Sequence, residues 1–192
     1  TLLFATISMT TALAQTTPKV EYFGISDVRL TQSAFKHAED MDIQYLLALN
    51  PDRLLAPYLK GAGLTPKADN YTNWENTGLD GHIGGHYLSA LSFMYAATGN
   101  EEIGRRLDYV LSELKRCQDT AGDGYLCGVP DGRKMWKEIE QGNVRAATFG
   151  LNDRWVPLYN IHKIYAGLRD AYLVAHREEA KDMLVKLTDW ME

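Results

Sequence analysis

The chain has 192 residues, of which 45% are hydrophobic and 23% are charged, and its formal net charge at pH 7 is −5. This size and composition fit one globular domain with a substantial core and leave too few residues for two large domains. The 20 Lys and Arg residues are spread along the sequence. Because nucleic-acid binding requires clustered cations opposite the phosphates, the composition argues against a nucleic-acid partner.

The first 14 residues are predicted to be the remnant of a secretory signal sequence. Residues 1–14 are apolar or small, carry no charge and end in Ala12-Leu13-Ala14, a small-residue pattern typical of a cleavage site. The run is too short and too rich in Thr to cross a bilayer, so no membrane span is expected. We therefore expect a secreted or periplasmic protein in which residues 15–27 form an extended tether.

The first predicted elements are a short strand-like piece at 27–30 and a helix after it. Ser33 is a suitable N-cap for a helix that continues to about Leu49, since apolar residues recur on one of its faces. A further turn of helix restarts at Pro51, and the glycine-containing stretch 61–66 ends it.

The rest of the chain predicts two helical hairpins. Each begins with a helix that is apolar or small on nearly every side, at 81–98 and 157–175. Each continues into a helix with a one-sided apolar stripe, at 101–118 and 178–192. The loop 119–130 and a short amphipathic turn near 135–140 separate the two hairpins. The first helix of each pair is therefore expected to be an inner, buried helix, and the second an outer, half-exposed one.

This order of helix types predicts an all-α fold. A hairpin of this kind cannot bury its apolar inner helix alone, so the hairpins must pack beside one another. Inner helices around a common axis and outer helices facing water give a partial (α/α)6 toroid or barrel. Residues 28–192 are assigned to the N-terminal portion of such a domain, because the last residues predict a helix in mid-course. The ring would then be open, with part of the inner-helix surface exposed.

Polar and aromatic residues gather where the two inner helices begin. The candidates are Trp74, Glu75, Asp80 and His82 at the first helix and His162 at the second. In a toroid these helix starts meet at one end, and helix N-termini present free N–H groups that suit a polar ligand. We expect these five residues to bind substrate.

Several of these residues allow other interpretations. His82 and His86 have the i, i+4 spacing of two metal ligands, but the sequence places no third ligand beside them, so no metal is assigned. A core position is an alternative for His86 and His162. Glu75 and Asp80 are candidates for general acid/base chemistry, but they also suit a helix cap or the support of a histidine tautomer.

The tryptophans and the cysteines also allow two interpretations each. Trp74 and Trp155 have rings that can stack on the C–H face of a sugar, although a single tryptophan more often serves ordinary packing. Cys117 and Cys127 are able to pair in an exported protein. Cys117 is equally compatible with a small buried residue at the end of a helix.

A set of motifs in a fixed order resembles a known family. The motifs are VRL (28–30), NPDRLL (50–55), WE (74–75), GLDGH (78–82), GHYLSA (85–90), DGYL (123–126) and WVPLYNIHKI (155–164). Together they resemble the start of the β-L-arabinofuranosidase-type glycoside hydrolases, families 127 and 146. The resemblance extends from about Val28 to the end of the chain, and its specificity lies in the joint order of the motifs.

The resemblance implies an α/α six-hairpin barrel followed by β-sandwich domains. It also implies retaining, exo-acting hydrolysis of β-L-arabinofuranosides in plant arabinose-containing glycans. In that family a zinc-bound cysteine is the nucleophile and a glutamate is the acid/base, both later in the chain than the residues present here. Zinc is thus expected in the full-length protein, and neither Cys117 nor Cys127 lies in a matching motif.

The resemblance assigns a substrate-pocket role to the motif positions Asp80, His82 and His162, and it extends this role to Trp74 and Glu75. No catalytic residue is assigned to this segment, which is expected to supply sugar-binding walls and to be inactive alone.

Two other functions remain open. One is a non-catalytic helical-repeat module that binds carbohydrate, and the other is a different α/α-toroid enzyme such as a polysaccharide lyase. The expected partner is an oligosaccharide or polysaccharide.

Overall fold

The computed structural model describes residues 20–192. Its elements are η1 (Ile25–Asp27), α1 (Ala34–Ala48), α2 (Pro51–Gly61), η2 (Asn73–Asn76), α3 (His82–Thr98), α4 (Glu101–Ala121), α5 (Gly132–Glu140), β1 (Ala146–Ala147), β2 (Gly150–Leu151), β3 (Arg154–Trp155), α6 (Pro157–Leu173) and α7 (Glu178–Met191). The fold is predominantly α-helical, which confirms the predicted class and is consistent with a partial α/α toroid. Among residues 20–192 no helix is long and apolar enough to cross a membrane.

Residues 20–33, the part of the N-terminal segment that the structure describes, form no strand. The predicted signal remnant at 1–14 and the first part of the 15–27 tether lie outside the described residues, and residues 20–33 are exposed. The strand-like piece predicted at 27–30 is wrong. Arg29 instead folds back on its own segment, where its Nη1 donates to the carbonyls of Ser26 (2.8 Å) and Val28 (2.9 Å).

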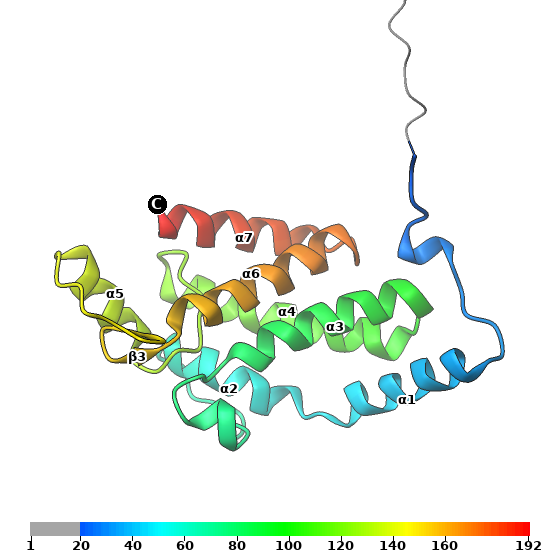
Figure 1. Cartoon of the computed structure of the whole chain (residues 1–192), viewed down its shortest axis with the longest axis horizontal. Helices are drawn as coiled ribbons and strands as arrows, with labels where there is room; N and C mark the ends of the chain where they lie inside the picture. The colour runs from blue at the N-terminus through cyan, green and yellow to red at the C-terminus, as the bar shows by residue number, and fades with distance from the viewer. Residues whose placement is uncertain (1–19) are drawn as a thin grey trace, which may run out of the picture.

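The two predicted hairpins are present, as α3–α4 and α6–α7, and α3 and α6 lie side by side (Figure 1). The two inner helices run in the same direction, because Gly85 faces residues 163–164 while Leu88 faces Gly167. A Cβ atom on Gly85 would lie 2.4 Å from the carbonyl carbon of Lys163, and one on Gly167 would lie 2.7 Å from the carbonyl oxygen of Gly85. The glycines therefore let the two backbones touch.

The core lies between the inner helices and the outer helix α4. The stripe predicted on the outer helix is buried, and its fully buried members are Ile103, Leu107, Leu111 and Leu114. They pack in one cluster with residues of α2, α3, α6 and α7. The prediction of a half-exposed amphipathic helix is confirmed, since Arg105 and Glu101 lie on its exposed side.

Part of the apolar surface is not covered. On α1, Phe35 is 75% exposed and Tyr45 is 64% exposed, and this helix lies at the edge of the molecule (Figure 1). Phe93 of α3 and Leu173 of α6, both on the predicted inner helices, are exposed as well. Each inner helix is thus buried against its neighbours and open on its remaining side, the arrangement expected of an open ring.

A small three-stranded antiparallel sheet, in the order β1-β2-β3, precedes α6 and was not predicted. Its turns use Asn152 and Asp153 in the left-handed backbone region. The buried Asn152 holds them, because its Oδ1 accepts from the backbone N–H of Arg145 (2.8 Å) and its Nδ2 donates to the carbonyl of Asn143 (2.8 Å). The sheet ends at Trp155 and so sets the position from which α6 starts.

Cys117 and Cys127 are both free and buried. Burial raises the pKa of Cys117 to about 12 and that of Cys127 to about 11. Because these values lie far above pH 8, roughly 0.1% or less of either thiol is ionised there. We therefore expect a thiol reagent at pH 8 to label both cysteines slowly in the native protein and quickly in denaturant, as followed by mass spectrometry. Rapid labelling of the native protein, or a disulfide between the two, would contradict the buried thiols.

Candidate functional site

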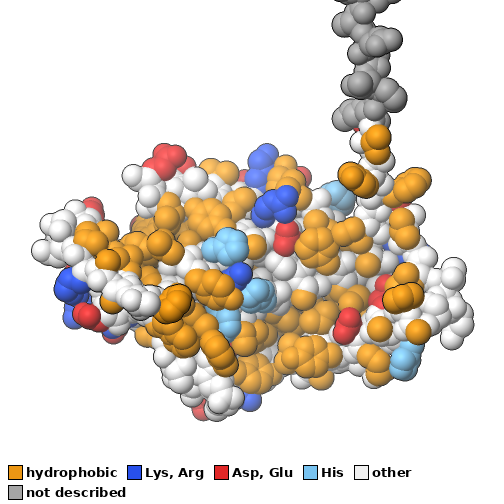
Figure 2. All heavy atoms as spheres, viewed as in Figure 1, with side chains coloured by type: hydrophobic (Ala, Val, Ile, Leu, Met, Phe, Trp, Pro, Cys, Tyr) orange, Lys and Arg blue, Asp and Glu red, His pale blue; other side chains and the backbone are white. Residues whose placement is uncertain are grey.

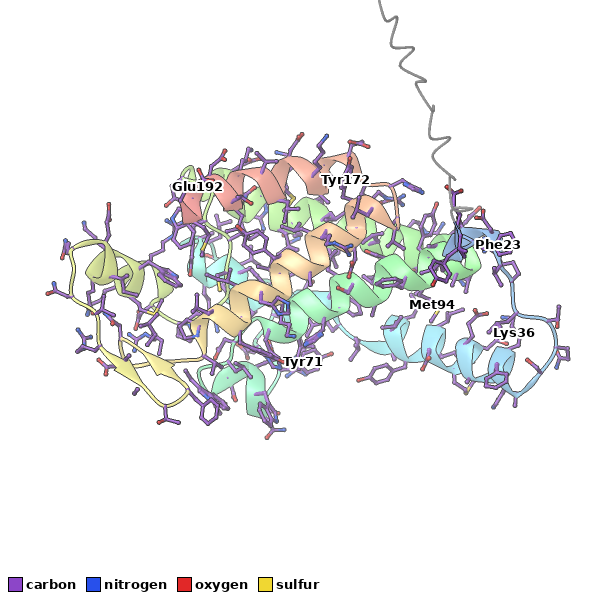
Figure 3. All side chains as sticks on the ribbon, turned by 45° about the horizontal axis from the view of Figure 1, so that its top comes forward. Phe23, Lys36, Tyr71, Met94, Tyr172 and Glu192 are labelled. Carbon is purple, nitrogen blue, oxygen red and sulfur yellow. The ribbon has the colours of Figure 1, made fainter. Side chains whose placement is uncertain are left out.

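The starts of α3 and α6 lie at the same end of the molecule. The side-chain amide of Asn160, fully buried in the first turn of α6, donates to the carbonyl oxygens of Asp80 (2.7 Å) and Leu79 (3.2 Å) just before α3. Figure 3 labels Tyr71 at this end and Met94 toward the other end of α3. The predicted meeting of the two helix starts is therefore observed, and one asparagine joins them.

Glu75 takes the place of a helix cap for α3. The N-cap position is Gly81, which has no side chain to offer. The Glu75 carboxylate instead accepts from the backbone N–H groups of Gly81 (Oε2, 2.8 Å) and Ile83 (Oε1, 3.0 Å). A negative charge at this position also suits the positive end of the helix dipole. Its side chain is 0% exposed, so Glu75 holds the helix start from inside the protein.

The Glu75 carboxylate also contacts a histidine. Its Oε1 lies 2.6 Å from Nδ1 of His82. Burial raises the pKa of Glu75 above its ordinary value, while the N–H groups of Ile83 and Gly81 and the charge of His82 act in the opposite direction. Three neighbouring donors thus offset part of the cost of burying this carboxylate, and burial still has the larger effect.

Asp80 also stabilises the loop that precedes α3. Its Oδ1 accepts from the backbone N–H of Gly78 (2.9 Å), and its Oδ2 accepts from the side-chain amide of Asn70 (2.9 Å). The same Asn70 amide donates to the carbonyl of Glu75 (2.7 Å). Asp80 is 9% exposed and borders a cavity of about 420 Å³ that Lys60 and other residues of α2 and α5 line. Its carboxylate therefore shapes the loop that leads into α3.

Aromatic rings cover the surface at the helix starts. Trp74 is 58% exposed and stacks on Trp155, with ring centroids 5.7 Å apart and planes at 23°. The His82 ring, which is largely buried, has its centroid 6.5 Å from that of Trp74 and 6.2 Å from that of Tyr159. These rings form an exposed apolar surface next to a histidine, an arrangement that suits the C–H faces and hydroxyls of a sugar.

The histidines share this open face. The His86 ring is perpendicular to that of His82 at 6.2 Å, and both His86 and His162 are exposed, which excludes a core position for either. Partial burial lowers the pKa of His86, and the nearby charges of Lys163, His82 and His162 lower it further. Figure 2 shows His side chains grouped around a cation over α3 and α6.

The comparisons with known proteins decide the family. A family model described as Beta-L-arabinofuranosidase, GH127 catalytic domain, matches residues 27–192. The chain belongs to this family. It is accordingly a glycoside hydrolase chain, and a carbohydrate is its ligand class. A search of curated proteins gave no match.

The described part of this GH127 chain does not provide a metal site. His82 and His86 have suitable spacing, but Nδ1 of His82 already contacts Glu75, and among residues 20–192 no three His, Cys, Asp or Glu side chains are grouped so that they could hold an ion. The zinc implied by the family resemblance is thus not accounted for by these residues.

Three residues of the candidate site were not singled out from the sequence. Asn70 and Tyr159 contact the predicted residues, and Lys163 lies over the Tyr159 ring at 4.3 Å. The i, i+4 spacing of Tyr159 and Lys163 beside His162 was an available signal, because it places all three near one face of α6. Asn70 lies in an irregular loop, where spacing gives no such signal.

Proposed function

We propose that Trp74, His82, Tyr159 and His162 form part of the sugar-binding surface of a retaining exo-β-L-arabinofuranosidase that acts on plant arabinose-containing glycans. The observation that supports this most is the group of rings where α3 and α6 begin, in which Trp74, Tyr159 and His162 are exposed and the mostly buried His82 ring lies near the first two. The family match supports a carbohydrate ligand, and the ring group supplies surfaces that suit one.

The chemistry of a furanose fits such a surface. Its C–H groups pack on aromatic rings, and its hydroxyls bond with imidazole nitrogens, which both donate and accept. Glu75 and Asp80 act differently in this proposal, because their carboxylate oxygens are already bonded inside the loop. They contribute to substrate binding by holding His82 and the start of α3 in place.

The proposal extends to the rest of the enzyme by family resemblance. In the family resemblance, the cysteine nucleophile, the glutamate acid/base and the zinc ligands are none of the residues that match the family motifs in this chain. The 192-residue chain is therefore expected to bind sugar without turnover. Export to the periplasm or the cell exterior is part of the proposal, supported by the pattern of residues 1–14.

Trp74→Ala and His162→Ala are each expected to weaken binding of an arabinofuranose oligosaccharide about tenfold, since each loses one ring contact or hydrogen bond of roughly 1.4 kcal/mol. Titration followed by NMR measures the affinities. Phe35→Ala is the matched control, because Phe35 is an exposed aromatic residue on α1. Equal binding by all three variants would contradict the proposed surface. Preferred binding of a uronic-acid oligosaccharide would instead favour a polysaccharide lyase.

A further inference from the structure

We propose that Glu75 is a positioning residue that fixes the tautomer of His82, with hydrogen on Nδ1 and with Nε2 left as a hydrogen-bond acceptor for a sugar hydroxyl. The first part concerns the protein alone. The second part rests on the proposed function.

The surroundings of Nδ1 determine where the ring hydrogen lies. Nδ1 is 2.6 Å from Oε1 of Glu75 and 2.9 Å from the carbonyl oxygen of Leu79. A carbonyl oxygen and a carboxylate oxygen only accept hydrogen bonds, so a bare Nδ1 would face two repelling lone pairs. Nδ1 therefore carries hydrogen whether the ring is neutral or charged. In the neutral ring the free lone pair must then be on Nε2.

Glu75 is the stronger of the two partners. The Leu79 carbonyl also accepts from the backbone N–H of His82 (3.2 Å) and from the Asn160 amide (3.2 Å), so several donors share it. The Glu75 contact is shorter and involves a charged acceptor, and such hydrogen bonds are roughly twice as strong as neutral ones.

Glu75 is also held rigidly enough to set the ring orientation. Both of its oxygens accept backbone N–H groups at the start of α3, from Gly81 and Ile83. Its side chain is 0% exposed, whereas that of His82 is 11% exposed. The carboxylate therefore cannot reach a ligand itself, and its influence on one passes through the imidazole.

The consequence for a ligand is chemical selectivity. Among the described residues the ring's hydrogen bonds to protein are all made through Nδ1. The neutral ring then presents Nε2 to a ligand as a hydrogen-bond acceptor. A free sugar hydroxyl can donate to this nitrogen, whereas a sugar oxygen that is substituted as an ether has no hydrogen to donate. Trp74 and Tyr159 both lie near the ring and supply apolar surface beside that hydroxyl.

The tautomer is measured directly by ¹⁵N NMR of the histidine rings at pH 8. We expect His82 of the wild-type chain to show a protonated Nδ1 and an unprotonated Nε2. This measurement needs no variant, so it stands even where a substitution impairs folding. An unprotonated Nδ1 in the wild-type spectrum would overturn the proposal while leaving the sugar-binding surface intact.

The role of Glu75 is tested with Glu75→Gln, whose amide is able to donate to Nδ1 as well as accept. We expect a mixture of tautomers and about fivefold weaker binding of an arabinofuranose oligosaccharide, equivalent to a net hydrogen bond of roughly 1 kcal/mol. Glu101→Gln is the matched control, since it removes an exposed carboxylate from the first turn of α4. An unchanged tautomer in E75Q would assign the effect to Leu79 and refute the role of Glu75. If neither protein binds the sugar but the tautomer changes, the proposed function fails and the positioning role stands.

Discussion

Replacing Gly85 with Ala is expected to lower the free energy of unfolding by about 2 kcal/mol or more, because the added methyl group overpacks the contact between α3 and α6. The new Cβ would lie 2.4 Å from the carbonyl carbon of Lys163, 2.5 Å from its oxygen and 2.7 Å from the nitrogen of Ile164. All three are backbone atoms that cannot rotate away. The helices must therefore separate, which loosens the packing of the buried Leu88 and Ile164.

The expected loss of stability in G85A is opposite in sign to the effect of helix propensity alone. Ala is favoured over Gly inside a helix by about 1 kcal/mol, so a loss of stability has to come from the interhelical contact. Urea denaturation gives the midpoint and slope for the variant and for Ser89→Ala, a control on the same helix at a half-buried position. A G85A protein at least as stable as S89A would show that α3 and α6 are not packed this closely.

Local signals in the sequence predicted the helices well because caps are local. Ser33 accepts from the N–H of Lys36, and Asn100 accepts from those of Glu102 and Ile103. Gly99 ends α3 in the left-handed region, which needs no Cβ. Each of these interactions involves residues within four positions of one another, so the pattern alone contains the information.

Features that depend on distant residues were not predictable in this way. Phe149, Asn152 and Val156 in and beside the small sheet have left-handed backbone conformations. The turns are held by hydrogen bonds between the Asn152 side chain and the backbone of Arg145 and Asn143, seven and nine positions earlier. The exposure of Phe35 depends on which other elements of the fold pack against α1, and these are distant in the sequence. Neither fact is encoded in the local spacing of residue types.

The candidate site was predicted in its location and only partly in its roles. The sequence placed Trp74, His82 and His162 at one end, and the structure brings their helices together there. Glu75 and Asp80 were expected to bind substrate, and the proposal now gives them only an indirect role in binding, through His82 and the start of α3. Their burial could not be foreseen, since carboxylates are rarely buried without partners and the partners come from the folded loop.

Replacing Asn160 with Ala is expected to lower the free energy of unfolding by about 2–4 kcal/mol, because buried polar groups lose their partner. The Asn160 side chain is 0% exposed and donates to the carbonyls of Leu79 and Asp80. Its Oδ1 accepts from the thiol of Cys127 (3.4 Å). One amide thus joins the start of α6, the loop before α3 and the segment after α4.

Two comparisons make this prediction specific. Asn76→Ala makes the same change at an exposed position of η2 and should alter stability by less than about 0.5 kcal/mol. Asn160→Asp keeps the shape but turns a carboxylate oxygen toward two carbonyl oxygens, so it should be at least as destabilising as N160A. Thermal and urea unfolding measure all three, and an N160D protein as stable as the wild type would refute the hydrogen-bond assignment. Since Asn160 also sets the position of α6 relative to His82, the folded fraction of N160A should bind an arabinofuranose oligosaccharide more weakly than N76A does.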